Sequence, residues 1–160
     1  MARNKTLSSR KERAAPDPLY GNVFVSKLIN RIMRDGKKSV AQKSVYHAFE
    51  IIKKHHDNPV EVFQEAIRNI SPQVEVRSRR IGGAAYQVPA PVRGPRKLSL
   101  ALRWLIFEAR NRPTAEYKTF SDKLAAEILD AFAGEGGAIK RKDTAHKMAE
   151  ANKAFSHFRW

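Results

Sequence analysis

The sequence has no cysteine, and its acidic residues are few beside its basic ones. Without cysteine the chain has no disulfide and no thiolate ligand for a metal, which is compatible with a reducing compartment. No apolar run approaches the roughly 20 residues that cross a membrane. The N-terminal stretch also lacks the apolar core of a secretory signal. These absences argue against a disulfide-stapled secreted protein and against a membrane protein.

Positive charge is the strongest feature of the composition. The 160 residues include 31 Lys and Arg against 16 Asp and Glu, which gives a net charge of +15. Such an excess favours a polyanionic partner. With 42% hydrophobic residues, a chain of this length can bury a real core as one domain. We therefore expect a folded basic protein that binds nucleic acid.

Residues that commonly carry catalysis are not arranged for it. Five histidines are present, but no two stand four residues apart as in zinc-binding helices. The run His55-His56-Asp57 is interpreted as a solvated helix end, because adjacent helical residues point in different directions. Phosphate-cradling glycine loops and nucleophile elbows are absent. We predict no enzyme, no metal and no cofactor. A small basic nuclease stays open as a rival, which a degradation assay with magnesium would reveal.

Apolar residues at helical spacing predict about six helices. Asn58 and Pro59 provide a cap and a first residue for the third helix, and Gly36 is expected as the left-handed C-terminal cap of the first. The last helix is expected to follow 140–142, with Asp143 as its cap. The predicted ranges are about 20–35, 39–55, 59–70, 97–111 and 120–132, followed by the C-terminal helix.

A β-hairpin is predicted between the third and fourth helices. Residues 74–77 alternate apolar and charged, Gly82-Gly83 suits a tight reversal, and 85–88 form the return strand. Prolines at 89, 91 and 95 should end the pairing. We therefore predict a mainly α fold: a basic, disordered RNA-binding tail at 1–18, then a single helical domain at 19–160 with a protruding hairpin arm at 73–89.

This arm concentrates positive charge, and we interpret it as RNA-binding. It carries Arg77, Arg79 and Arg80, with Glu75 as its one acidic residue from 74 to 97. Tyr86 either offers a stacking surface for a base or packs on a helix. A rival is an architectural DNA binder that inserts the arm into the minor groove, for which only Ile81 could act as an apolar wedge.

Two further basic segments point the same way. Lys37-Lys38 stands at a helix start, where positive charge opposes the helix dipole and a phosphate partner would be favourable. In the last helix basic residues outnumber Asp143 and Glu150, which predicts a cationic face. The basic residues of that segment are Lys140, Arg141, Lys142, Lys147, Lys153 and Arg159.

Several long segments resemble small-subunit ribosomal protein seven of the bacterial and organellar type. They are 35–39 (DGKKS), 72–88 (PQVEVRSRRIGGAAYQV), 101–104 (ALRW) and 146–160 (HKMAEANKAFSHFRW). The resemblance implies a helical bundle with a hairpin arm. It also implies a structural, non-enzymatic protein that binds the 3′ major domain of small-subunit ribosomal RNA and organises the head of the subunit. The segment between Trp104 and Leu124 departs from the family pattern.

The resemblance further implies partners and contact residues. The arm would lie near the exit-site tRNA and the path of the mRNA, in a cytoplasmic ribosome or an organellar one. Neighbours would be small-subunit proteins nine, eleven, thirteen and nineteen. The implied RNA-binding residues are Arg3, Lys5, Arg10, Lys11 and Arg13 of the tail, Lys37, Lys38, Arg77, Arg79, Arg80, Gly82, Gly83, Tyr86, Arg93, Arg96, Lys97, Arg103, and the six basic residues of the last helix.

Overall fold

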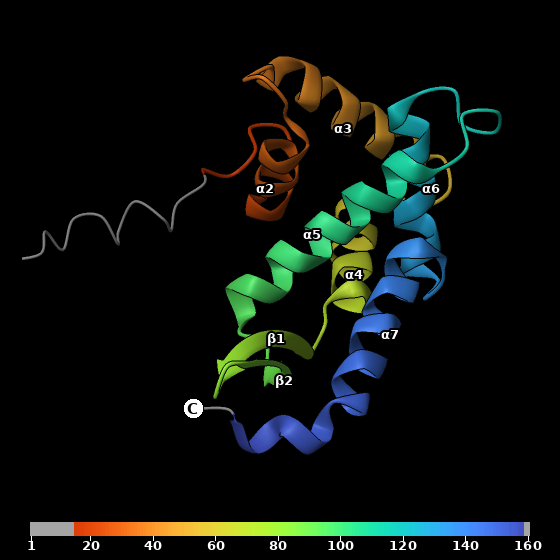
Figure 1. Cartoon of the computed structure of the whole chain (residues 1–160). Helices are drawn as coiled ribbons and strands as arrows, with labels where there is room; N and C mark the ends of the chain where they lie inside the picture. Colours follow the sequence, from red (N-terminus) through yellow and green to blue (C-terminus); the bar gives the residue numbers. More distant parts are fainter. Residues whose placement is uncertain (1–14, 159–160) are drawn as a thin grey trace, which may run out of the picture.

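The computed structural model describes residues 15–158, which fold mainly into helices (Figure 1). The hairpin lies between the third and fourth of these helices, so the predicted mainly α fold with an inserted hairpin is confirmed. The elements are α2 (Val23–Ile32), α3 (Lys38–Lys53), α4 (Pro59–Ile70), β1 (Val74–Ile81), β2 (Ala84–Pro91), α5 (Gly94–Asn111), α6 (Phe120–Phe132), α7 (Gly136–Ala151) and the 3₁₀ helix η1 (Lys153–Phe158).

The apolar stripes of the helices meet in one core. Helix α6 packs against α3, α4 and α5, and its Ile128 is fully buried. Leu105 of α5 is equally inaccessible to solvent. Phe49 of α3 and Phe63 of α4 face each other in this core, with ring centroids 5.7 Å apart. Burying such side chains removes apolar surface from water and is the main stabilising contribution.

The first helix ends earlier than the sequence analysis expected. The side chain of Asn22 accepts a hydrogen bond from the Phe24 N–H at 2.7 Å and caps the start of α2. The helix stops at Ile32, and Asp35 and Gly36 follow in a separate turn with φ values of 53° and 72°. Gly36 therefore has the predicted left-handed backbone, but its expected role as the helix cap is wrong.

Helices α5 and α7 begin before their predicted starts. Pro95 lies in the first turn of α5, where a missing N–H breaks no intrahelical bond. Helix α7 begins at Gly136, well before Asp143, so Asp143 is not its cap. Instead Glu127 of α6 accepts a hydrogen bond from the Ala138 N–H at 2.9 Å. A carboxylate from another helix thus supplies the acceptor, which local sequence does not show.

The hairpin closes through a two-residue turn. Gly82 and Gly83 have φ values of 57° and 89°, the positive pair that a type I′ turn requires. The strands pair from Ile81 with Ala84 down to Val74 with Pro91, so the second strand continues past the predicted end at residue 89.

Two prolines are compatible with this longer strand. The Val92 N–H donates to the Gln73 carbonyl at 2.9 Å, so inward-bonding N–H groups recur at alternate residues from Val92. Pro89 and Pro91 fall on the other positions, where no N–H is needed.

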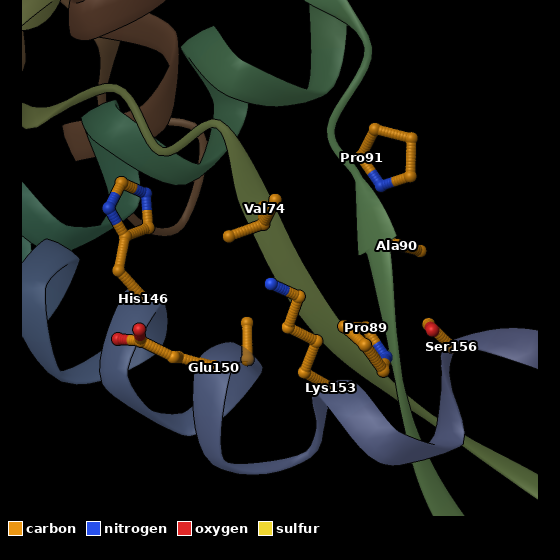
Figure 2. A pocket seen from close by; sticks show the side chains of 9 residues that line it. Val74, Pro89, Ala90, Pro91, His146, Glu150, Lys153 and Ser156 are labelled. Carbon is orange, nitrogen blue, oxygen red and sulfur yellow. The ribbon is translucent and has the colours of Figure 1, made fainter.

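The base of the hairpin leans on the C-terminal helices (Figure 2). The Gln73 N–H donates to Nε2 of His146 on α7 at 3.1 Å. An open hollow of about 370 Å³ lies between the strands and α7–η1. Pro89 lines it from β2, and Lys153 lines it from η1. These contacts fix the arm at its base, while Gly82 and Gly83 at the tip are exposed.

Candidate nucleic-acid interface

Four arginines line an open groove beside the hairpin. Arg77 and Arg79 reach it from β1, Arg93 from the connection to α5, and Arg96 from the first turn of that helix. The groove measures about 720 Å³, and none of its lining residues is acidic. Arg80 is not among them, because alternate residues of a strand face opposite sides. The predicted trio of arginines is therefore divided between two faces of the arm.

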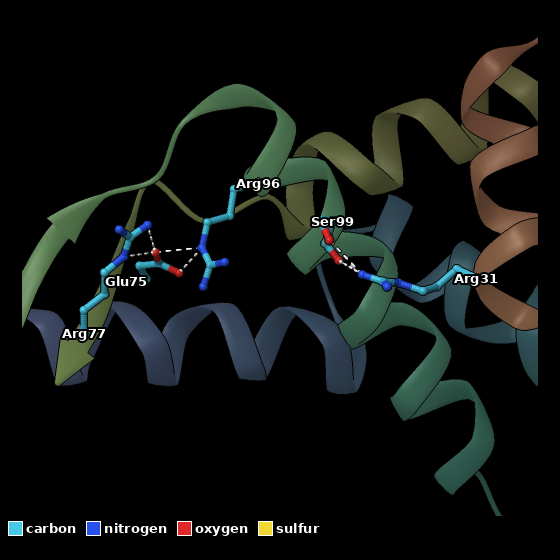
Figure 3. A network of polar contacts seen from close by, with 5 residues as sticks. All are labelled: Arg31, Glu75, Arg77, Arg96 and Ser99. Atoms are coloured by element: carbon cyan, nitrogen blue, oxygen red, sulfur yellow. Dashed lines mark hydrogen bonds and ion pairs between the residues drawn. The ribbon is translucent and has the colours of Figure 1, made fainter. Parts of the chain in front are cut away.

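A buried carboxylate holds two of these arginines (Figure 3). Glu75 is 8% exposed. It accepts hydrogen bonds from Nε of Arg96 at 2.7 Å and from Nε of Arg77 at 2.6 Å. Burial by itself raises the pKa of Glu75, but the hydrogen bonds and positive charges of Arg96 and Arg77 outweigh it. They leave the pKa below its ordinary value of 4.5.

A second groove continues the first toward α2. It measures about 600 Å³ and shares Pro95 and Arg96 with the four-arginine groove. Lys27 and Arg31 of α2 form its far side. Arg31 donates from Nη2 to the hydroxyl of Ser99 on α5 at 2.7 Å, which fixes its position (Figure 3). The two grooves together make a cationic band that runs from the hairpin to α2.

Lys37 and Lys38 lie at the start of α3 and are both exposed. Lys37 borders another hollow, of about 490 Å³, together with Arg34 and Arg110 and without an acidic residue. Arg110 donates to the Ile32 carbonyl at 3.2 Å. Burial and the charge of Arg34 lower the pKa of Arg110 from its ordinary value. Like charges gathered in this way are stabilised by an anion.

Metal and membrane sites are not found in the part of the chain that the structure describes. Residues 15–158 contain no group of three or more His, Asp or Glu side chains placed to hold a metal ion. Among the helices of the same range, none is both long and apolar enough to cross a membrane.

Comparison with known proteins decides the family. The family described as ribosomal protein S7p/S5e matches residues 3–153. Small ribosomal subunit protein uS7 of Carboxydothermus hydrogenoformans is 55% identical over 151 residues, covering 94% of this chain and 95% of the relative. The protein of the same name from Thermoanaerobacter pseudethanolicus is 57% identical, covering 91% and 92%. That from Thermotoga maritima is 52% identical, covering 95% and 97%. The chain belongs to the ribosomal protein S7p/S5e family.

Membership settles the broad class of function. The protein is a structural constituent of the small ribosomal subunit and not an enzyme, and binding of ribosomal RNA is the general role of the S7p/S5e family. The nuclease interpretation is thereby excluded.

Two of the basic residues predicted on the last helix make contacts with other residues of the protein. Arg141 pairs with Glu108 of α5 and lies 4.0 Å from the ring centroid of Phe107. Lys142 donates to the Asn69 carbonyl at 2.8 Å. Within residues 15–158, the exposed members that have no acidic partner are Lys140, Lys147 and Lys153.

Tyr86 packs on the C-terminal 3₁₀ helix. Its ring centroid lies 5.4 Å from that of Phe155 and 5.4 Å from that of Phe158. Of the two interpretations of this residue, the packed one describes the structure, and Tyr86 ties the hairpin to η1. As an RNA contact, Tyr86 stays a prediction.

The other predicted residues lie on α5 and β1 or outside the described range. Lys97 is half-buried and Arg103 exposed on α5, and Arg80 is exposed on β1 near the Gly82-Gly83 turn. Arg3, Lys5, Arg10, Lys11, Arg13 and Arg159 lie outside the residues that the structure describes.

The structure adds residues that the sequence prediction did not include. Lys27 and Arg31 border the second groove, and Arg34 and Arg110 border the hollow at Lys37. Lys27 and Arg31 stand four residues apart on α2 and are not among its buried residues, and Arg34 follows three residues later, beyond the helix end at Ile32. This helical spacing of basic residues is the sequence signal that could have identified them.

Proposed function

We propose that the four-arginine groove and the hairpin arm bind the 3′ major domain of small-subunit ribosomal RNA. The observation that carries this proposal is the acid-free groove, where Arg77, Arg79, Arg93 and Arg96 converge from separate parts of the chain. Guanidinium groups pair with phosphate through planar forks of N–H donors. A concave surface with four of them fits RNA backbones that converge in a folded domain better than an isolated duplex.

The mechanism is stabilisation of folded RNA. Each arginine that neutralises a phosphate releases condensed counterions and lowers the cost of bringing RNA helices together. The arm is fixed at its base by α7 and η1, so its cations act from a rigid support. In the same proposal the exposed tip lies near the exit-site tRNA and the mRNA path of a cytoplasmic ribosome. Small-subunit proteins nine, eleven, thirteen and nineteen are its neighbours.

The test is a pair of variants with equal change in charge. Arg79→Ala/Arg93→Ala removes two groove arginines that have no carboxylate partner among residues 15–158. Lys53→Ala/Lys54→Ala removes two exposed cations at the end of α3, outside the groove. Binding to a fragment of the 3′ major domain is measured across a salt series.

We expect the groove variant to bind about tenfold or more weakly. The slope of its log affinity against log salt concentration should become shallower by about one to two. The control should keep its slope. Equal behaviour of the two variants would show that RNA responds only to net charge and would overturn the proposal.

A further inference from the structure

One buried acidic residue pairs with two arginines of the four-arginine groove, and its negative charge would repel RNA. Glu75 is the most buried residue of β1, and a buried carboxylate is costly unless it is paired. Its partners are Arg77 and Arg96, two of the four groove arginines. The fold therefore keeps a buried negative charge in contact with two of the arginines that we propose to bind RNA.

The geometry shows what this carboxylate does to the two guanidinium groups. Arg96 offers its Nε to both carboxylate oxygens at 2.7 Å. Arg77 offers its Nε and Nη2 to Oε1, each at 2.6 Å. A guanidinium has five N–H donors, so Glu75 engages one edge of each group and leaves the other donors free of it. Both arginine side chains remain 50% exposed.

We infer that Glu75 is a positioning residue, which fixes Arg77 and Arg96 so that their free N–H edges present a preformed pair of phosphate-binding forks in the groove. This inference rests on the proposed function and deepens it. An unpaired arginine on a strand or helix start samples many rotamers, and ordering it on binding costs conformational entropy. A carboxylate that has already ordered two of them removes that cost before RNA arrives. Arg96 borders both grooves, so its position also governs where they join.

Positioning and simple neutralisation predict opposite changes in RNA affinity when the charge of Glu75 is removed. If Glu75 only cancels charge, removing its charge leaves the groove more positive and RNA binds more tightly, whatever its sequence. If Glu75 positions the arginines, removing its charge weakens binding to the RNA whose phosphates match the forks. An unrelated RNA, which makes adaptable contacts, then loses nothing.

The central variant is Glu75→Gln, which keeps the shape and removes the charge. Its matched control is Glu65→Gln, because Glu65 also pairs with an arginine, Arg68 at 2.8 Å, and is not among the residues of either groove. Each variant is measured for affinity to the 3′ major domain fragment and to an unrelated structured RNA of equal length at matched salt. Far-UV circular dichroism and thermal melting establish the temperature range in which each variant is folded.

We expect Glu75→Gln to bind the matching fragment about fivefold to tenfold more weakly, a loss that corresponds to about 1–1.4 kcal/mol, and to bind the unrelated RNA as well as before or better. Glu65→Gln should leave the ratio of the two affinities unchanged. Arg96→Lys keeps the charge without the fork, so it should lower the same ratio in a protein whose Glu75 is intact. This variant tests the inference even where Glu75→Gln melts too early to assay.

The outcomes separate the two proposals. If Glu75→Gln or Arg96→Lys binds the matching fragment as tightly as the parent while Arg79→Ala/Arg93→Ala still weakens it, the positioning role is wrong and the groove function stands. If the double variant has no effect either, the groove function fails as well.

Discussion

Residues 15–158 contain two networks in which arginine and carboxylate side chains link three residues, and these networks differ in whether the arginine is buried. Arg112, between α5 and α6, bonds Glu127 at 2.7–2.8 Å and also pairs with Asp130. The Arg112 side chain is only 14% exposed and that of Glu127 only 2%. In the groove network the side chain of Glu75 is 10% exposed, while the side chain of each of its two arginines is 50% exposed.

This difference teaches how the same chemistry serves two purposes. When the arginine is buried, its donors are used up inside the protein: Arg112 bonds Glu127, Asp130 and the hydroxyl of Tyr117. Such a network joins helices and offers nothing to a partner. When the carboxylate is buried and its arginines are not, as at Glu75, each arginine side chain remains 50% exposed. Under the proposed function, exposure of the arginines above a buried acid is what leaves their N–H donors available to an anion.

The largest effect should come from breaking the buried network. Arg112→Ala would leave Glu127 as an unpaired buried charge, and we expect a loss of about 3–5 kcal/mol in the free energy of unfolding. The control is Arg103→Ala, which removes an exposed arginine of α5 and should change stability by less than about 0.5 kcal/mol. Urea unfolding followed by circular dichroism measures both, and similar losses in the two variants would contradict the assignment of Arg112 as structural.

Much of the fold could be predicted from local sequence. Apolar spacing located the helices, Asn58 and Pro59 marked the start of α4, and Gly82-Gly83 marked the hairpin turn. The misplaced start of α7 has a physical cause, since its acceptor comes from Glu127 in another helix. A tertiary hydrogen bond of that kind leaves no mark near Gly136 in the sequence.

The groove could be predicted less completely than the fold. Clustered arginines indicated an RNA-binding arm, but the prediction grouped Arg80 with Arg77 and Arg79, although alternate residues of a strand face opposite sides. The pairing of Glu75 with Arg96 joins residues 21 positions apart, so it depends on how α5 packs against the arm. Similarly, Arg141 and Lys142 look like a basic patch in the sequence, and only the structure shows that they bind Glu108 and the Asn69 carbonyl.

A smaller effect should follow from removing the charge of Glu75, and it should depend on pH. The folded-state pKa lies below the ordinary 4.5, so ionised Glu75 stabilises the fold above that pH. The contribution is lost as the pH falls through the lowered value. We expect Glu75→Gln to be less stable than the parent by about 1–3 kcal/mol at neutral pH. The gap should close as the pH falls through the lowered pKa of Glu75. Urea unfolding at a series of pH values checks this, and a gap that stays constant into acid would mean that packing, not charge, causes it.

The smallest effect should come from a pair in which both partners are exposed. Arg68 and Glu65 lie 2.8 Å apart on α4, with side chains 73% and 44% exposed. Water already solvates both charges, so the ion pair gains little, and Arg68→Ala should cost less than about 1 kcal/mol. A double-mutant cycle with Glu65→Ala isolates the coupling, which added salt should abolish because exposed charges are screened. If this coupling equalled that of Arg112 with Glu127, burial would not be what distinguishes the networks. The exposure of the arginines above Glu75 would then be no argument for phosphate binding. A coupling near zero would show that burial of at least one partner is what distinguishes the Arg112 network, which joins helices, and the Glu75 network, which we propose to bind phosphate, from an exposed ion pair.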